Sequence, residues 1–138
     1  MLFSLFSSIS FAQFTPVEIA KLLAADGAAD DLFGYSVSIS GDQAIIGAIY
    51  DDDNGSYSGS AYLFERDGSG NWNHVAKLIA SDGAANDYFG YNVSISGDRA
   101  IVGAHNDDDN GSDSGSAYIY DWNGTSWVET KLTAADAA

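Results

Sequence analysis

The sequence predicts an all-β protein, namely a β-propeller fragment of about two four-stranded antiparallel blades with an extra N-terminal outer strand. The first reason is an internal repeat, because residues 21–66 and 77–122 align without a gap and are identical at 32 of 46 positions. The second is that each copy holds four short apolar runs separated by turn residues, with no helical periodicity of useful length. Four antiparallel strands repeated about every 50 residues are typical of propeller blades.

The apolar runs of the first copy each have the length of a strand. In YSVSIS, Val37 and Ile39 share one face and serines the other, which predicts a half-buried strand. QAIIGA is apolar nearly throughout and is expected to be covered on both faces. SAYLFE and WNHVAKLI complete the blade, and residues 17–23 are expected to supply the extra outer strand. The four runs span residues 35–40, 43–48, 60–65 and 72–79.

The repeats organise the chain into one propeller segment over residues 13–138. Its copies lie at about 21–76 and 77–130, and a third begins at 131–138. Two complete blades cannot close a ring, because closed propellers use about four to eight. We therefore expect a fragment of a longer protein, whose further blades come from the same gene. The alternatives are self-association of several copies into one ring, or an open stack of repeats.

The N-terminus has the character of a secretory leader. MLFSLFSSISFAQF is apolar and Ser-rich, and Ala12 before Gln13 suits a cleavage site. A basic segment before the apolar stretch is missing, as in a leader truncated at its start. Residues 1–12 therefore predict a secreted or cell-surface protein, with an ordinary apolar first strand as the alternative. The stretch is too short and too Ser-rich to cross a membrane.

Composition excludes several classes of function. Twenty acidic against five basic residues give a net charge of −15, which repels nucleic acid and anionic lipid. The absence of cysteine excludes disulfides, thiolate catalysis and Cys-ligated zinc. An extracellular protein or glycan is the expected partner.

The motifs of the repeat resemble a known family. FGYSVSISGDQAIIGA at 33–48 and FGYNVSISGDRAIVGA at 89–104, each followed by GSAY, are similar to FG-GAP repeats, the blades of integrin-α-type propellers. The resemblance extends from Lys21 to the C-terminus. It departs from the family at Ile49 and His105, which stand where the motif has proline. The resemblance implies a propeller that acts in adhesion or ligand binding.

The repeated aromatic and glycine residues have structural explanations. Phe33 and Phe89 are predicted to fill the wedge between adjacent blades. Glycines are expected where a strand comes too close to its neighbour for a Cβ atom. These glycines are Gly34, Gly47, Gly90 and Gly103.

The repeated stretch DDDNGS is the candidate metal site. Its carboxylates would repel one another, and a divalent cation such as calcium would relieve that repulsion. Against this, the calcium loop of integrin-like repeats lies between the Phe-Gly and Gly-Ala strands, where this chain has only Ser-Gly-Asp. The alternative is a solvated turn. The candidate calcium ligands are Asp51, Asp52, Asp53, Asp107, Asp108 and Asp109.

No catalytic constellation stands out, so an enzyme is not expected. His74 and His105 are single, and a catalytic pair of carboxylates usually breaks a repeat, whereas these acidic residues recur. The tryptophans are expected to pack, although they could stack on sugar rings. The sequence thus favours an exported, non-enzymatic segment for adhesion or ligand binding. The alternatives are a carbohydrate-active or carbohydrate-binding propeller and a structural spacer of a larger secreted protein.

Overall fold

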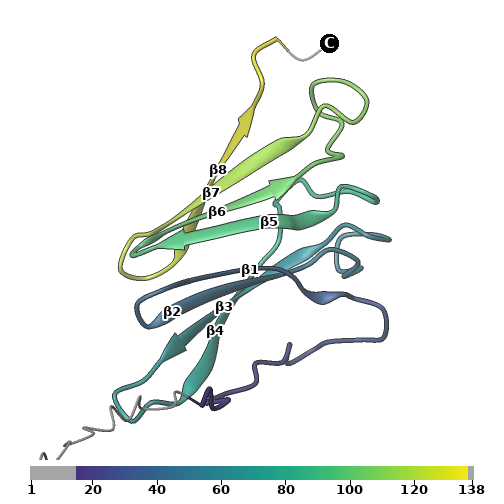
Figure 1. The fold of residues 1–138 in the computed structure, drawn as a ribbon. Helices are drawn as coiled ribbons and strands as arrows, with labels where there is room; N and C mark the ends of the chain where they lie inside the picture. Colours follow the sequence, from purple (N-terminus) through teal and green to yellow (C-terminus); the bar gives the residue numbers. More distant parts are fainter. Residues whose placement is uncertain (1–14, 137–138) are drawn as a thin grey trace, which may run out of the picture.

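The described part of the chain folds into eight strands in two separate sheets (Figure 1). A computed structural model describes residues 15–136, so the predicted leader at 1–12 lies outside the described residues. Each sheet has four antiparallel strands in chain order, as predicted for a propeller blade. The first sheet contains β1 (Phe33–Ser40), β2 (Gln43–Ala48), β3 (Ser60–Arg66) and β4 (Trp72–Leu78). The second contains β5 (Phe89–Ser96), β6 (Arg99–Ala104), β7 (Ser116–Trp122) and β8 (Trp127–Thr133).

The Phe-Gly motif forms a bulge at the start of each inner strand. Phe33 is paired with Ala48 and Ser36 with Gly47, so two extra residues of β1 lie between these pairs, and β5 repeats the irregularity. Gly34 has a φ of 96°, a conformation that glycine adopts without strain. The bulge therefore explains why a glycine follows the phenylalanine.

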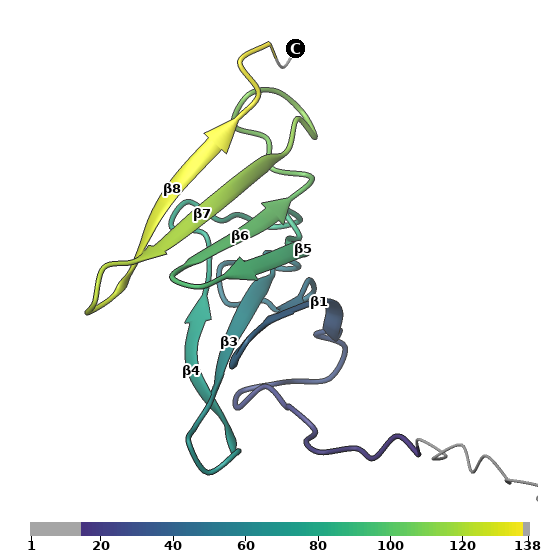
Figure 2. The same cartoon turned by 60° about the vertical axis from the view of Figure 1, so that its left-hand side comes forward.

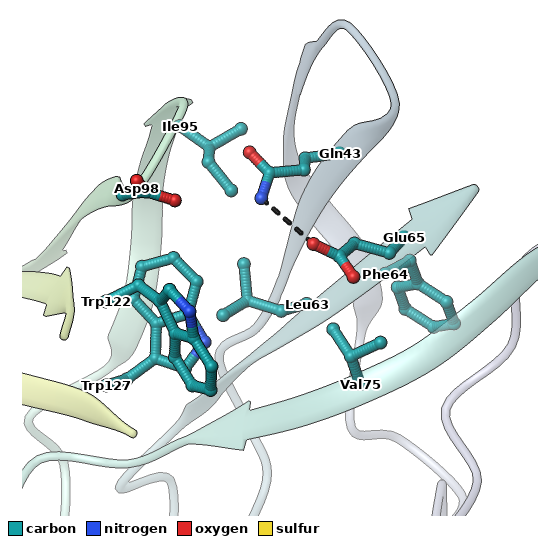
Figure 3. A pocket seen from close by; sticks show the side chains of 9 residues that line it. All are labelled: Gln43, Leu63, Phe64, Glu65, Val75, Ile95, Asp98, Trp122 and Trp127. Carbon is teal, nitrogen blue, oxygen red and sulfur yellow. Dashed lines mark hydrogen bonds between the residues drawn. The ribbon is translucent and has the colours of Figure 1, made fainter. Parts of the chain in front are cut away.

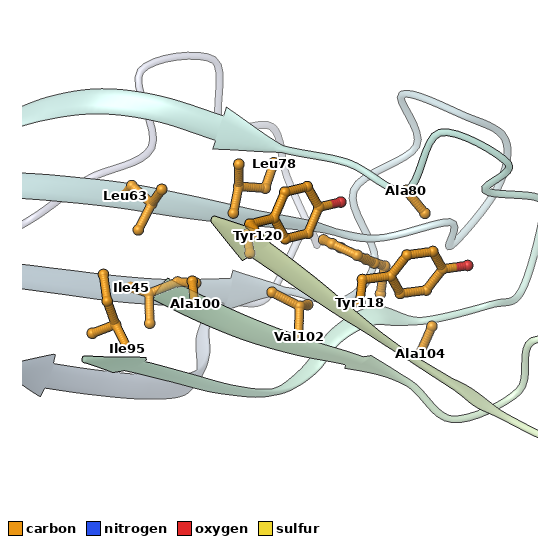
Figure 4. Packing of buried hydrophobic residues seen from close by; sticks show 12 residues of the cluster. Ile45, Leu63, Leu78, Ala80, Ile95, Ala100, Val102, Ala104, Tyr118 and Tyr120 are labelled. Carbon is orange, nitrogen blue, oxygen red and sulfur yellow. The ribbon is translucent and has the colours of Figure 1, made fainter. Parts of the chain in front are cut away.

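The two sheets lie side by side in both views (Figures 1 and 2), and their shared core joins them. Ile45 and Leu63 of the first sheet pack with Val102 and Tyr118 of the second, and all four are almost fully buried (Figure 4). Phe89 is fully buried in this cluster, edge-on to the rings of Tyr118 and Tyr120. This is the interblade position predicted for it.

Close backbone approach explains one predicted glycine especially well. A Cβ atom on Gly47 would lie 2.1 Å from the carbonyl oxygen of Gly90, and the Ser36 hydroxyl donates a hydrogen bond of 2.6 Å to the same oxygen. Gly103, the counterpart of Gly47 in the second sheet, has its nearest neighbouring atom at 3.9 Å. Gly34 has none within 4 Å, so its φ angle, and not crowding, accounts for it.

The predicted N-terminal outer strand is not confirmed. Residues 17–23 have no strand structure, although Leu22 and Ala24 pack on the face of the first sheet that points away from the second. A strand needs a hydrogen-bonding partner, and in the described part of the chain residues 17–23 pair with neither sheet. Within residues 15–136, no helix is long and apolar enough to span a membrane.

Candidate functional site

The two Asp-rich loops occupy equivalent places, one after β2 and one after β6. Each loop turns through repeated backbone bonds, such as that from the amide of Gly59 to the carbonyl of Asp51 at 2.9 Å and that from Gly115 to Asp107 at 2.9 Å. Only the first aspartate of each DDDNGS is buried. Asp51 is 4% exposed and Asp107 is 2% exposed, so both require partners for their charge.

Neutral donors satisfy part of the Asp51 carboxylate. The Ser60 hydroxyl donates to Oδ1 at 2.7 Å, and the backbone amide of Asp53 donates to the same atom at 3.2 Å. The Tyr62 hydroxyl lies 3.0 Å from Oδ2 and 2.9 Å from Asp26. Ser60 and Tyr62 belong to the Gly-Ser-Ala-Tyr motif, which places both donors on β3.

A lysine ammonium lies at the centre of this cluster. Lys77 Nζ is 2.9 Å from Asp51, 2.7 Å from Asp53 and 2.7 Å from Asp26. The same ammonium lies 5.1 Å from the centre of the Tyr62 ring, within cation–π distance. Because Asp26 precedes β1 and Lys77 belongs to the edge strand β4, the cluster joins the start of the repeat to its last strand.

The second repeat builds the same arrangement. Lys131 Nζ of β8 lies 2.8 Å from Asp107, 2.7 Å from Asp82 and 2.5 Å from Asp109. Tyr118 lies 2.9 Å from both Asp107 and Asp82 through its hydroxyl. We refer to these two groups, centred on Lys77 and Lys131, as the lysine clusters.

The electrostatics favour the charged forms in both lysine clusters. Burial disfavours ionisation of Asp51 and Asp107, but the hydrogen bonds from lysine, serine and tyrosine outweigh it and lower the pKa of each carboxyl. Burial likewise disfavours the ammonium of Lys77 and Lys131, but the surrounding carboxylates prevail and raise the pKa of each lysine.

The six aspartates predicted as calcium ligands therefore separate into three roles. The first of each loop is buried, and the third contacts the lysine. The second accepts a backbone amide at 2.7 Å, Asp52 from Tyr57 and Asp108 from Asp113, as expected of a turn. The first loop also binds the chain that enters the second sheet, with Phe89 donating to the carbonyl of Ser58 at 2.9 Å.

Sequence reasoning missed the two lysines, together with their partners Asp26 and Asp82. The repeat contained the signal, because the Ala-Asp-Gly or Ser-Asp-Gly motif recurs in register with DDDNGS. A lysine also follows each DDDNGS at a similar distance, 26 residues after Asp51 and 24 after Asp107. The lysine is positively charged and the aspartates of DDDNGS are negatively charged, and a buried carboxylate needs a partner of opposite charge.

The second lysine cluster brings three carboxylates close together. Carboxylate oxygens of Asp82, Asp107 and Asp109 lie within 4.8 Å of one another, close enough to surround one cation. All three also contact Lys131 at 2.8 Å or less. Calcium takes six to eight oxygen ligands at about 2.3–2.6 Å. The arrangement thus fits an ammonium ion and does not fit calcium while the lysine is in place.

An aromatic cluster lies near the same end of the sheets. Tyr57 stacks on Tyr88 with ring centres 6.2 Å apart, and His105 lies 5.4 Å from Tyr88 and 4.0 Å from Tyr91. Tyr35 packs on Tyr91 at 5.2 Å and remains about half exposed, as does Tyr57. We call this group, with Tyr50, the tyrosine cluster.

These features define a repeat module of the β-propeller type. The FG-GAP repeat family matches the chain twice, at residues 16–64 and 72–120, and each match ends within the strand that bears the cluster tyrosine. The chain therefore belongs to the FG-GAP repeat family, a family of β-propeller-like binding modules typical of extracellular and cell-surface proteins. No curated protein matches it.

Proposed function

We propose that the chain is an exported, non-enzymatic propeller segment that binds a protein or glycan ligand at the cell surface, in adhesion or a related role. The observation that carries this proposal is the pairing of both buried, repeated carboxylates with lysine. Asp51 and Asp107 each have an ammonium within 3 Å and a lowered pKa, which suits a structural ion pair and not a general acid. Membership of the FG-GAP family supports a binding role.

Calcium and the lysine ammonium would compete for the same carboxylates. The ion would have to displace Lys131 to reach Asp82, Asp107 and Asp109 together. We therefore propose that lysine supplies the positive charge in these loops at ordinary calcium concentrations.

The tyrosine cluster favours glycan binding as the second candidate function. Half-exposed aromatic rings such as Tyr35 and Tyr57 present flat apolar faces with a polar edge, which suits the mixed surface of a sugar ring. In this version the protein is a carbohydrate-binding propeller without hydrolytic activity.

Two measurements test the proposal. Fractionation of the producing cells should find the chain outside the cytoplasm. Recovery of the chain in the cytoplasm with its leader intact would refute export. A glycan array measures binding to sugars, and a reducing-sugar assay on the same chain should show no hydrolysis. Binding that is lost in Tyr35→Ala and kept in Tyr62→Phe would assign it to the tyrosine cluster, whereas release of reducing ends would refute the non-enzymatic assignment.

A further inference from the structure

A pocket lies between the two sheets at the end opposite the Asp-rich loops (Figure 3). Its volume is about 130 Å³, and it is lined by hairpin residues of both repeats. Leu63 of β3 and Ile95 of β5 are buried in its wall, whereas Val75 of β4 is half exposed. The pocket is thus apolar within and reaches the surface.

Two carboxylates border the pocket, and each lacks the arginine that its counterpart in the other repeat has. Glu65 corresponds to Asp121, which forms an ion pair with Arg99 at 2.6 Å. Gln43 stands at the place of that arginine and gives Glu65 only a neutral hydrogen bond of 3.2 Å. Among residues 15–136, Glu65 has no ion-pair partner.

Asp98 also lacks an arginine partner, but here it is the second repeat that lacks the arginine and the first that has it. Its counterpart Asp42 pairs with Arg66 at 3.4 Å, but Trp122 stands where the second repeat would have that arginine. The backbones are equivalent, because Arg66 donates to the carbonyl of Asp42 and Trp122 to that of Asp98, both at 2.8 Å. Asp98 also has no ion-pair partner within the described part of the chain.

Two tryptophans complete the pocket. The rings of Trp122 and Trp127 lie 5.7 Å apart and are inclined at 50° (Figure 3). Trp122 is 39% exposed, so part of its ring is open to a ligand. Tryptophan is the aromatic residue that attracts organic cations most strongly.

We propose that this pocket binds an arginine side chain presented by a partner protein. The guanidinium would lie by the tryptophan rings between Asp98 and Glu65, and the alkyl stem would pack on Leu63 and Val75. In the other repeat an arginine lies beside the counterpart of each carboxylate, so the fold accepts a guanidinium at both equivalent positions. A pocket of this size holds one side chain and leaves the partner's backbone outside. The inference does not depend on the proposed function, because neither lysine cluster nor the tyrosine cluster contributes to the pocket.

Titration calorimetry with the full chain tests the proposal at low salt. The probe is acetyl-Gly-Arg-Gly-amide, and its neutral match is the same peptide with citrulline in place of arginine. We expect binding of the arginine peptide and at least about tenfold weaker binding of the citrulline peptide. Equal binding of the two peptides, or no binding of either, would overturn the proposal.

Variants taken from the repeat itself assign the site. Trp122→Arg installs the residue of the first repeat, and we expect it to pair with Asp98, occupy the pocket and abolish binding. Asp98→Asn should weaken binding about tenfold, and it keeps the claim testable if Trp122→Arg does not fold, as judged by circular dichroism. Asp136→Asn removes the same charge from an exposed position. A loss of affinity in Asp136→Asn equal to that in Asp98→Asn would reduce the effect to net charge and overturn the site.

Discussion

Lys77 Nζ lies 2.9 Å from Oδ2 of Asp51, and this contact joins a carboxylate that is almost fully buried to an ammonium that reaches the surface. Exposed ion pairs contribute little to stability, because water screens both charges. Loss of one partner from a buried pair costs far more, because the other charge remains without compensation. The lysine clusters therefore have the energetic character of core contacts.

Removal of one cluster lysine should destabilise the protein strongly. We expect Lys131→Met to lower the free energy of unfolding by about 3 kcal/mol, since Asp107 would stay buried without its cation. Urea unfolding measures the difference. Arg99→Met is the matched control, because Arg99 pairs with Asp121 in an exposed position, and it should cost less than about 1 kcal/mol. Equal losses of unfolding free energy in the two variants would contradict the distinction between the buried and the exposed ion pair.

Calcium should affect the lysine variant more than the natural chain. Lys131→Met leaves Asp82, Asp107 and Asp109 around a vacated centre, so calcium at tenfold excess over its Kd should restore about 1.4 kcal/mol. Thermal unfolding in EDTA and in millimolar calcium measures this. The natural chain should unfold at the same temperature in both, and a rise of several degrees in calcium would show that the ion displaces lysine.

The tyrosine hydroxyls of the lysine clusters should contribute measurably. Tyr118→Phe removes a donor to a buried carboxylate, and we expect a cost of about 1–3 kcal/mol. Tyr57→Phe serves as the control, because the Tyr57 hydroxyl makes no hydrogen bond within the described residues and its side chain is 41% exposed. Chemical unfolding of both variants compares them, and similar stabilities would argue against the hydrogen bond to Asp107.

The close approach of β2 to β5 should make one glycine irreplaceable. In Gly47→Ala the new methyl group would overlap the carbonyl of Gly90, and we expect a cost of about 3 kcal/mol. Gly103→Ala is the same change in the second repeat, where space is available, and should alter stability by less than about 1 kcal/mol. Thermal unfolding of the two variants measures the difference. Equal unfolding temperatures would mean that β2 and β5 lie farther apart than in the structure.

Stability should be constant over a wide range of pH and fall at both ends. Asp26, Asp51, Asp82 and Asp107 have lowered pKa values, so their contribution is complete above about pH 4 and is lost as pH falls through the folded values. The lysines have raised pKa values, so theirs is complete below about pH 10.4 and is lost as pH rises through the folded values. Urea unfolding as a function of pH tests this. The alkaline loss should shrink in a chain with Lys77→Met and Lys131→Met, and an unchanged loss would assign it to other groups.

The strands were predictable because their determinants are local. Alternation in YSVSIS and turn residues after it depend on neighbouring positions, and β1 and β2 form where those patterns place them. The face of β1 was not predictable in this way, because Val37 and Ile39 are exposed and the serine face lies toward β5, where Ser36 and Ser38 form hydrogen bonds. The outer strand at residues 17–23 failed for the opposite reason, since a strand also needs a partner that its own residues cannot reveal.

The candidate site was only partly predictable. The acidic composition of DDDNGS was visible, but the burial of Asp51 beside exposed Asp52 depends on how the loop turns. Lys77 lies 26 residues from Asp51, and only the pairing of β3 with β4 brings them together. A repeat comparison restricted to charged residues would have suggested the pair, because both members recur.

The backbone amide of Ile95 donates a hydrogen bond to the hydroxyl oxygen of Ser38, and this bond has a consequence for how the chain folds. It joins residues 57 apart, which is the greatest separation of any side-chain hydrogen bond among the described residues and close to one repeat length. Contacts between the sheets thus require the closure of loops of only one repeat, and the entropy of closure depends on that length. A formed first sheet can act as a template on which the second assembles, so the folding rate should be set by a single repeat and not by the number joined in series.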